Sequence, residues 1–205
     1  MSITVEREFP AGIFCLEGEW EDDLSDRLSV RPILDLLRSL GVATYIHRDA
    51  VTIGDFEHYL GKWIDEYTEY KILYLAMHGG SGAVALGKDS LSLDELGYML
   101  QGACKGRVVY FGSCSTLKLE LADLQEFARM TGARAVIGYR RNVPWLETAA
   151  FEVLLLDRLA RGIRSDAVFN RLVNEHENLA RTLGLVVATR SKVHKVPLRR
   201  SRPKG

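Results

Sequence analysis

The sequence predicts an α/β fold with three layers, in which helices cover both faces of a mostly parallel central sheet of about six strands. Short, nearly continuous apolar runs alternate along the chain with longer segments whose apolar residues recur at helical spacing. Strands that are covered on both faces have such uniformly apolar sequences. The 205 residues suit a single domain, which we place at residues 1–189.

The first half of the chain alternates regularly between strands and helices. Residues 13–16 are the first predicted strand, and an acidic loop over residues 17–26 follows it. Pro32 at a helix start and Gly41 as a stop delimit the first helix, and residues 43–47 are the second strand. Residues 55–70 place a stripe of apolar side chains on one helical face: Phe56, Tyr59, Leu60, Trp63, Ile64 and Tyr67.

The middle of the chain holds two apolar strands that end in reactive residues. Residues 71–77 form the third strand, which leads into His78, Gly79 and a loop rich in glycine and serine. Ser92 and Glu95 form a capping box that opens the next helix. Residues 107–111 are the fourth strand, and Cys114 follows it.

The second half continues the alternation. A helix is predicted from residue 117 to residue 128, a fifth strand over residues 133–138, and a long helix from Pro144 to Gly162. Another helix begins at Ser165 and ends near Gly184, and residues 185–188 form a sixth strand. Residues 190–205 are strongly basic, and we expect a flexible tail there.

Composition excludes several classes of function. The formal net charge is zero, so nothing global directs the protein to nucleic acid or to a membrane surface. No signal-like start is present and no apolar run approaches the roughly 18 residues that span a bilayer, so we expect a cytoplasmic protein. The three cysteines lack the pairing of a zinc site, and we expect neither a metal nor a cofactor. Cys15 and Cys104 lie in apolar contexts typical of inert packing.

His78 and Cys114 are the candidate catalytic pair. If their strands are neighbours in a parallel sheet, both residues lie at the carboxyl edge, where open α/β sheets hold their ligands. A positioned histidine can take the proton of a thiol, which makes a cysteine nucleophilic. The backbone amides of Gly79 and Cys114 are the predicted oxyanion hole, the latter because it lies near a helix start. His47 and Asp49 follow the second strand and could reach the same edge.

The apolar strand with His78-Gly79 and the later apolar strand with Cys114-Ser115 resemble the caspase-fold (clan CD) cysteine peptidases. Residues 131–138, the helix over residues 145–162 and the segment 165–168 are similar to the closing half of the bacterial CHAT-type members. This resemblance implies a caspase-like endopeptidase with His78 as general base and Cys114 as nucleophile. It also implies a regulated bacterial stress or antiviral-defence effector. Gly112 stands where caspases have Gln and metacaspases have Asp, so neither specificity transfers.

Two loops at the same edge are the candidate substrate-binding segments: residues 19–23 after the first strand and residues 139–145 after the fifth. The arginines of the second loop would favour an acidic substrate residue before the scissile bond, whereas the acidic first loop would favour a basic residue there. The sequence leaves both preferences open. The candidate residues are Glu19, Trp20, Asp22, Tyr139, Arg140, Arg141 and Trp145.

A catalytically inactive caspase-like scaffold, or a signalling or ligand-binding module, is the alternative function. An α/β-hydrolase would have a second glycine after the nucleophile, and Thr116 stands there. The expected partner is a peptide or protein substrate. A helix that begins at Leu117 leaves no linker for maturation by cleavage, so we expect control by a small molecule, a sensor protein or assembly into a homo-oligomer.

Overall fold

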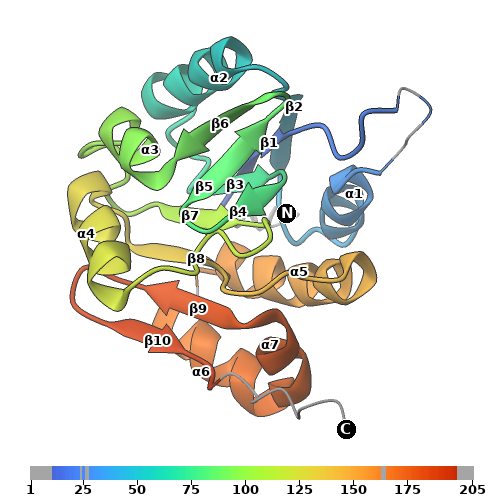
Figure 1. Cartoon of the computed structure of the whole chain (residues 1–205). Coiled ribbons are helices and arrows are strands. Elements are labelled where there is room, and N and C mark those ends of the chain that lie inside the picture. Colours follow the sequence, from blue (N-terminus) through green and yellow to red (C-terminus); the bar gives the residue numbers. More distant parts are fainter. Residues whose placement is uncertain (1–10, 24, 26–27, 163–164, 198–205) are drawn as a thin grey trace, which may run out of the picture.

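The protein is built on a seven-stranded sheet of order β10-β9-β8-β7-β3-β1-β2 (Figure 1). The computed structural model describes residues 11–23, 25, 28–162 and 165–197. Five neighbouring strands run parallel: β2 (Tyr45–Asp49), β1 (Ile13–Glu17), β3 (Ile72–Ala76), β7 (Val108–Phe111) and β8 (Ala135–Tyr139). The sheet continues through β9 (Leu185–Ala188), antiparallel to β8, and β10 (Val193–Lys195), antiparallel to β9.

Helices cover both faces of this sheet (Figure 1). One face packs against α1 (Arg31–Ser39), α5 (Trp145–Ala160), α6 (Ser165–Glu175) and α7 (Glu177–Leu183). The other packs against α2 (Ile53–Asp65), α3 (Leu93–Met99) and α4 (Leu121–Thr131). The predicted three-layer fold with a mostly parallel central sheet is therefore confirmed. In the described part of the chain, no helix has the length and apolarity needed to cross a membrane.

Successive strand residues face opposite layers, which explains the uniformly apolar strand sequences. In β1, Ile13 and Cys15 belong to the core on the α1 and α5 face, whereas Phe14 and Leu16 belong to the core on the α2 face. All five residues of β3 are buried. The sheet therefore has no solvent-exposed face around its centre, so a site that is open to a ligand has to lie at its edges or ends.

A small second sheet occupies the segment that the sequence analysis treated as a loop. It has the order β4 (Gly79–Gly80), β5 (Ala83–Leu86) and β6 (Asp89–Ser92), all antiparallel. Gly82 and Gly87 turn the chain at positive φ angles of 75° and 60°. Val84, Leu86 and Leu91 bury one side of this sheet in the core, which holds such short strands in place.

The helix predicted from residue 117 begins later, at Leu121, so that prediction is wrong in its start. Leu117 is fully buried, and its N–H donates to the carbonyl of Tyr139 instead of opening a helix. Ser115 adopts a φ of +53° and turns the chain after Cys114. The Cys114 amide is consequently not at a helix start, and the predicted help from a helix dipole does not apply.

Two predictions near the C-terminal end are also corrected. The helix expected between Ser165 and Gly184 is split at His176, whose backbone is non-helical, and no Gly or Pro in the sequence marks that break. Val193–Lys195, placed in the expected basic tail, pairs with β9 because Val196 beside it is buried in the core. Residues 198–205 of that tail lie outside the described residues.

Candidate active site

The carboxyl ends of β3 and β7 meet, as the sequence predicted. The two strands pair in parallel with Leu75 opposite Phe111, so the segments that follow them leave the same edge of the sheet. A Cβ on Gly79 would lie 2.1 Å from Thr116 Oγ1 and 2.8 Å from the carbonyl oxygen of Cys114. Only glycine allows the chain after His78 to approach the Cys114 turn this closely.

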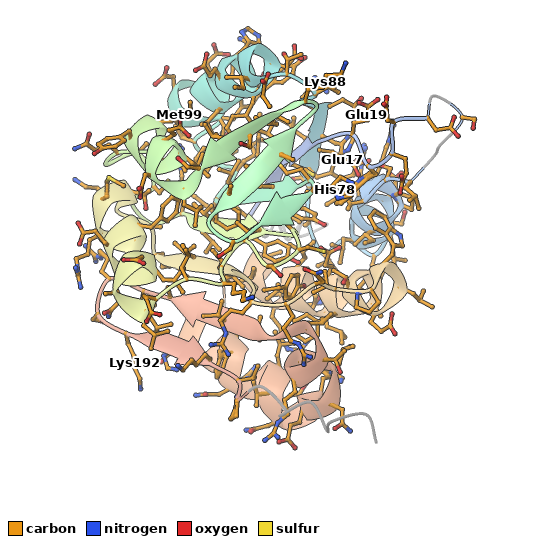
Figure 2. The ribbon with its side chains drawn as sticks, viewed as in Figure 1. Glu17, Glu19, His78, Lys88, Met99 and Lys192 are labelled. Atoms are coloured by element: carbon orange, nitrogen blue, oxygen red, sulfur yellow. The ribbon has the colours of Figure 1, made fainter. Side chains whose placement is uncertain are left out.

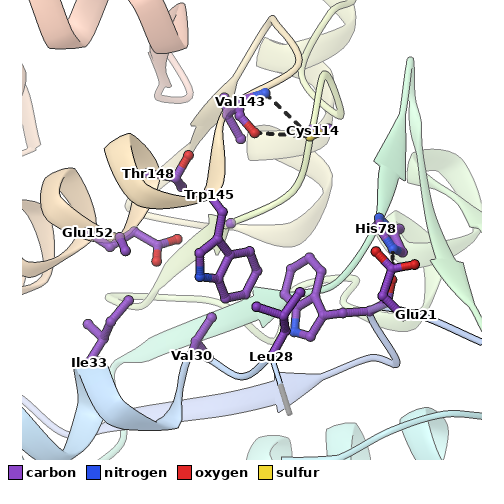
Figure 3. A pocket seen from close by; sticks show the side chains of 13 residues that line it. Glu21, Leu28, Val30, Ile33, His78, Cys114, Val143, Trp145, Thr148 and Glu152 are labelled. Carbon is purple, nitrogen blue, oxygen red and sulfur yellow. Dashed lines mark hydrogen bonds between the residues drawn. The ribbon is translucent and has the colours of Figure 1, made fainter. Parts of the chain in front are cut away.

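His78 and Cys114 line one pocket of about 220 Å³ (Figure 3). Its other walls come from the loop after β1, from α1, from the segment that leads into α5 and from α5 itself. They consist of Trp20, Glu21, Leu28, Val30, Ile33, Gly112, Val143, Trp145, Thr148, Ala149 and Glu152. The structure therefore brings the predicted residues Trp20 and Trp145 together with the candidate pair, and the two indole rings meet edge to face with centroids 4.7 Å apart.

Trp20 holds His78 through its backbone and its ring. The Nε2 atom of His78 lies 2.5 Å from the Trp20 carbonyl oxygen, and the two rings are 5.3 Å apart in an edge-to-face arrangement. Because a carbonyl oxygen can only accept, Nε2 carries the proton, and in the neutral ring Nδ1 is the basic nitrogen. His78 is otherwise exposed to solvent.

The Cys114 thiol contacts the loop after β8. The N–H of Val143 donates to Sγ at 3.4 Å, and Sγ lies 3.9 Å from the Val143 carbonyl oxygen (Figure 3). Ser115 reinforces this contact, since its N–H donates to the Arg141 carbonyl and its hydroxyl donates to the Asn142 side chain. Among the described residues, no hydrogen bond joins His78 to Cys114.

A buried carboxylate, Glu17 at the end of β1, organises the wall opposite Cys114. It is 3% exposed and accepts hydrogen bonds from Trp20 Nε1, Ser29 Oγ and the Val30 N–H, and its Oε2 lies 2.5 Å from His47 Nε2. Burial opposes the charge, but these hydrogen bonds outweigh it and hold the pKa of Glu17 below its usual value. Figure 2 shows where Glu17, Glu19 and His78 lie in the whole molecule.

A second buried carboxyl, Glu152 on α5, lies at the inner end of the pocket (Figure 3). Tyr110 donates to Oε1 at 2.8 Å, and Tyr139 lies 2.8 Å from the Tyr110 hydroxyl. The buried Tyr74 hydroxyl faces the same carboxyl without completing a hydrogen bond. The pKa of Glu152 is raised to about 7, chiefly by burial and also by the charge of Glu17, although hydrogen bonding by the neighbouring tyrosines lowers it in part.

Five predicted substrate-binding residues do not line this pocket. Tyr139 is fully buried and points into the core, so its prediction as a substrate contact is wrong. The Arg140 guanidinium donates to the Val196 carbonyl, and Arg141 contributes its carbonyl to Ser115. Glu19 and Asp22 are exposed in the loop after β1, outside the pocket.

Sequence reasoning missed Glu152 and most of the apolar lining, and it predicted the loop that holds Glu21 without singling that residue out. Glu152 carries a usable signal, because it is the one carboxylate among the buried residues of α5, with Phe151 and Leu155 beside it. A charged residue on an otherwise apolar helical face is rarely buried without a partner or a function. Leu28 and Val30 give no such signal, since their place depends on how the loop after β1 folds back.

Among the described residues, one group of side chains places potential metal-ligand atoms within 4.8 Å of one another: Glu17, His47 and Asp49. Both Glu17 oxygens are already occupied by hydrogen bonds from the protein, and His47 supplies one of these contacts. The group therefore acts as a polar anchor between β1, β2 and the loop after β1. His47 and Asp49, which the sequence brought to this edge, do not line the pocket.

Comparison with known proteins places the chain in a family. Residues 11–187 match the model described as "Family of unknown function (DUF6642)", and the chain belongs to that family. A search of curated proteins finds no match. A solved structure of caspase-1 from Spodoptera frugiperda superposes with a TM-score of 0.39 and 10% sequence identity, over 53% of this chain and about half (49%) of the caspase-1 chain.

We expect Glu17→Gln to destabilise the protein, because an amide cannot accept all of the hydrogen bonds that the carboxylate receives. The loss should be roughly 2–4 kcal/mol at pH 7, measured by urea unfolding. Since the pKa of Glu17 is lowered in the folded state, its contribution is present above about pH 4.5 and disappears as the pH falls further. Wild type and variant should therefore converge at low pH, and the exposed Glu21→Gln is the matched control. Equal stability at pH 7 would contradict this role.

We expect the opposite pH dependence for Glu152. Its pKa rises from about 4.5 when unfolded to about 7 when folded, so the folded state loses stability between these values as the pH increases. Glu152→Gln removes this penalty, since an amide still accepts from Tyr110 and can donate to Tyr74. At pH 8 the variant should unfold at higher urea concentration, by roughly 2–3 kcal/mol, and below pH 4.5 the difference should vanish. Glu147→Gln, an exposed site on the same helix, should change neither value.

Proposed function

We propose that this pocket is the active site of a cysteine endopeptidase, with Cys114 as nucleophile and His78 as general base. The observation that carries the proposal is the placement of both residues on one pocket from adjacent parallel strands, with the basic Nδ1 of His78 selected by the Trp20 carbonyl. A strand-end histidine and cysteine in a cleft are the elements of thiol activation. The resemblance to caspase-fold peptidases supports the same assignment.

Backbone amides near Cys114 fit the second requirement, stabilisation of an oxyanion. Among the described residues, the Cys114 N–H donates to no protein acceptor. Ala85 donates to the His78 carbonyl, so in the antiparallel ladder the next pair, Gly79 with Val84, is a non-hydrogen-bonded one. The Gly79 N–H is then directed away from β5. Both predicted donors are thus available to a substrate.

The reaction follows from these roles. His78 Nδ1 takes the Sγ proton, and the thiolate adds to the carbonyl carbon of the scissile peptide, whose oxygen becomes the oxyanion. The C–N bond breaks as His78 returns the proton to the leaving amine, which leaves a thioester on Cys114. Water, deprotonated by His78, then hydrolyses the thioester and restores the thiol.

The resting contacts of Cys114 require a rearrangement before this chemistry, because the thiol contacts Val143 and not His78. The proposal therefore includes control of the activity: a small molecule, a sensor protein or self-assembly shifts the loop over residues 140–144. A role in bacterial stress or antiviral defence, which the resemblance implies, belongs to the same proposal. An inactive ligand-binding scaffold is the second candidate, and the missing contact between His78 and Cys114 is the observation in its favour.

We expect Cys114→Ala and His78→Ala to abolish thiol-dependent peptide cleavage, each lowering kcat/KM by at least about 1000-fold, because either change removes the activated nucleophile. An iodoacetamide probe should label Cys114 alone, since Cys15 and Cys104 are buried and burial raises the pKa of both thiols.

His58→Ala is the matched control, because His58 is an exposed histidine on α2, outside the pocket. All variants should keep the wild-type circular dichroism and melting temperature. An active preparation that keeps its turnover after Cys114→Ala would exclude the proposal. Absence of both cleavage and labelling with every added peptide and protein would favour the scaffold.

A further inference from the structure

The pocket has the size and lining of a site for one long side chain. Its volume of about 220 Å³ lies below the roughly 300–1,000 Å³ of sites for drug-sized ligands. Trp20 and Trp145 provide aromatic walls, Val30 and Ile33 provide apolar ones, and the Glu152 carboxyl lies at the inner end (Figure 3). The His78 and Cys114 side chains share its rim, so a side chain bound inside would hold its own backbone beside the nucleophile.

The Glu152 carboxyl lies in space that is free because Gly112 has no side chain. A Cβ on Gly112 would lie 2.8 Å from Oε1 of Glu152 and 3.1 Å from the Tyr74 hydroxyl. Gly112 precedes Cys114 by two residues and lines the pocket, so the two polar groups lie directly beneath the pocket wall. Among the described residues, the carboxyl accepts one hydrogen bond, from Tyr110, and the Tyr74 hydroxyl makes none. The Glu152 carboxyl, which lines the pocket, therefore has capacity left to accept from a ligand.

The charges around the pocket have one sign. Glu21 at its mouth and Glu152 at its inner end are the carboxylates of its lining, and no lysine or arginine belongs to that lining among the described residues. The guanidinium of Arg140 donates to the Val196 carbonyl, and neither Arg140 nor Arg141 lines the pocket. Of the two preferences that the sequence left open, acidic or basic, these contacts favour the basic one.

We infer that the pocket binds the arginine or lysine side chain that precedes the scissile bond, and that Glu152 is the specificity-determining residue. This inference rests on the proposed peptidase function. A guanidinium matches the donor pattern of a carboxylate and stacks on indole faces, and a lysine would offer the same charge without the planar fork. A bound cation also favours the ionised carboxylate, which burial alone disfavours.

The first test compares peptide substrates that differ only in the residue before the scissile bond: Arg, Lys, Gln, Leu and Asp. The wild type should prefer Arg and Lys, and Glu152→Gln should lower kcat/KM for these two by roughly 100-fold while changing the Gln and Leu substrates little. Glu147→Gln, the same substitution on an exposed face of α5, should leave the whole profile unchanged. A wild type that cleaves best after Asp or Leu would overturn the inference and leave the peptidase standing.

Glu21→Lys is an independent test of the same preference, since Glu21 is exposed and its replacement disturbs no core contact. It places a cation at the pocket mouth and should weaken Arg and Lys substrates by roughly ten-fold, with Leu substrates unaffected. A preference for Arg that survives both variants would remove Glu152 and Glu21 from the recognition of substrate.

The second test does not need catalysis. Agmatine, a small guanidinium compound, should shift the indole N–H signals of Trp20 and Trp145 in NMR spectra of the Cys114→Ala protein, while the signal of the buried Trp63 stays in place. Glu152→Gln in that background should abolish the shift, and pentylamine without the guanidinium should bind more weakly. If no peptide is cleaved but agmatine binds through Glu152, the peptidase fails and the cation pocket stands. If agmatine at millimolar concentration moves neither signal, the inference fails.

Discussion

The buried carboxylate of Glu17 is the interaction on which the candidate site depends. It ties the end of β1 to Trp20, to the start of α1 through Ser29 and Val30, and to β2 through His47. Trp20 in turn supplies the carbonyl that fixes His78 and one of the two indole walls. The histidine therefore owes its position to a residue that contacts neither it nor the pocket directly.

A charge suits this position because the loop after β1 has few apolar residues with which to pack. Residues 19, 21, 22 and 23 are exposed carboxylates, so the loop cannot be held by burial alone. One fully hydrogen-bonded carboxylate orders two backbone segments and an indole at once, and its hydrogen bonds offset the cost of desolvation. Removal of a single donor would leave the buried charge with three of its four partners and would weaken the anchor.

The sequence predicted those parts of the site that local patterns determine. Uniformly apolar strands placed His78 and Cys114 at one edge, because parallel strands end on the same side of a sheet. It could not place Glu152 or exclude Tyr139, since each depends on which way a strand or helix faces after the layers have packed. The short strands around Val84 and Leu91 were missed because three or four residues give no reliable period, and the helix start at Leu121 because a buried Leu117 mimics a first helical turn.

One continuous segment carries both the partner of the thiol and the inner end of the pocket. Val143 contacts Cys114 Sγ, Trp145 forms a wall and opens α5, and Glu152 lies two turns further along the same helix. Helix α5 packs through Phe151 and Leu155 into the core, so it moves as a unit or not at all. The contact of the thiol, one aromatic wall and the inner carboxyl of the pocket therefore lie on one short stretch of chain. No glycine separates Val143 from Glu152, so this stretch lacks the residue that would most readily let its two ends move independently.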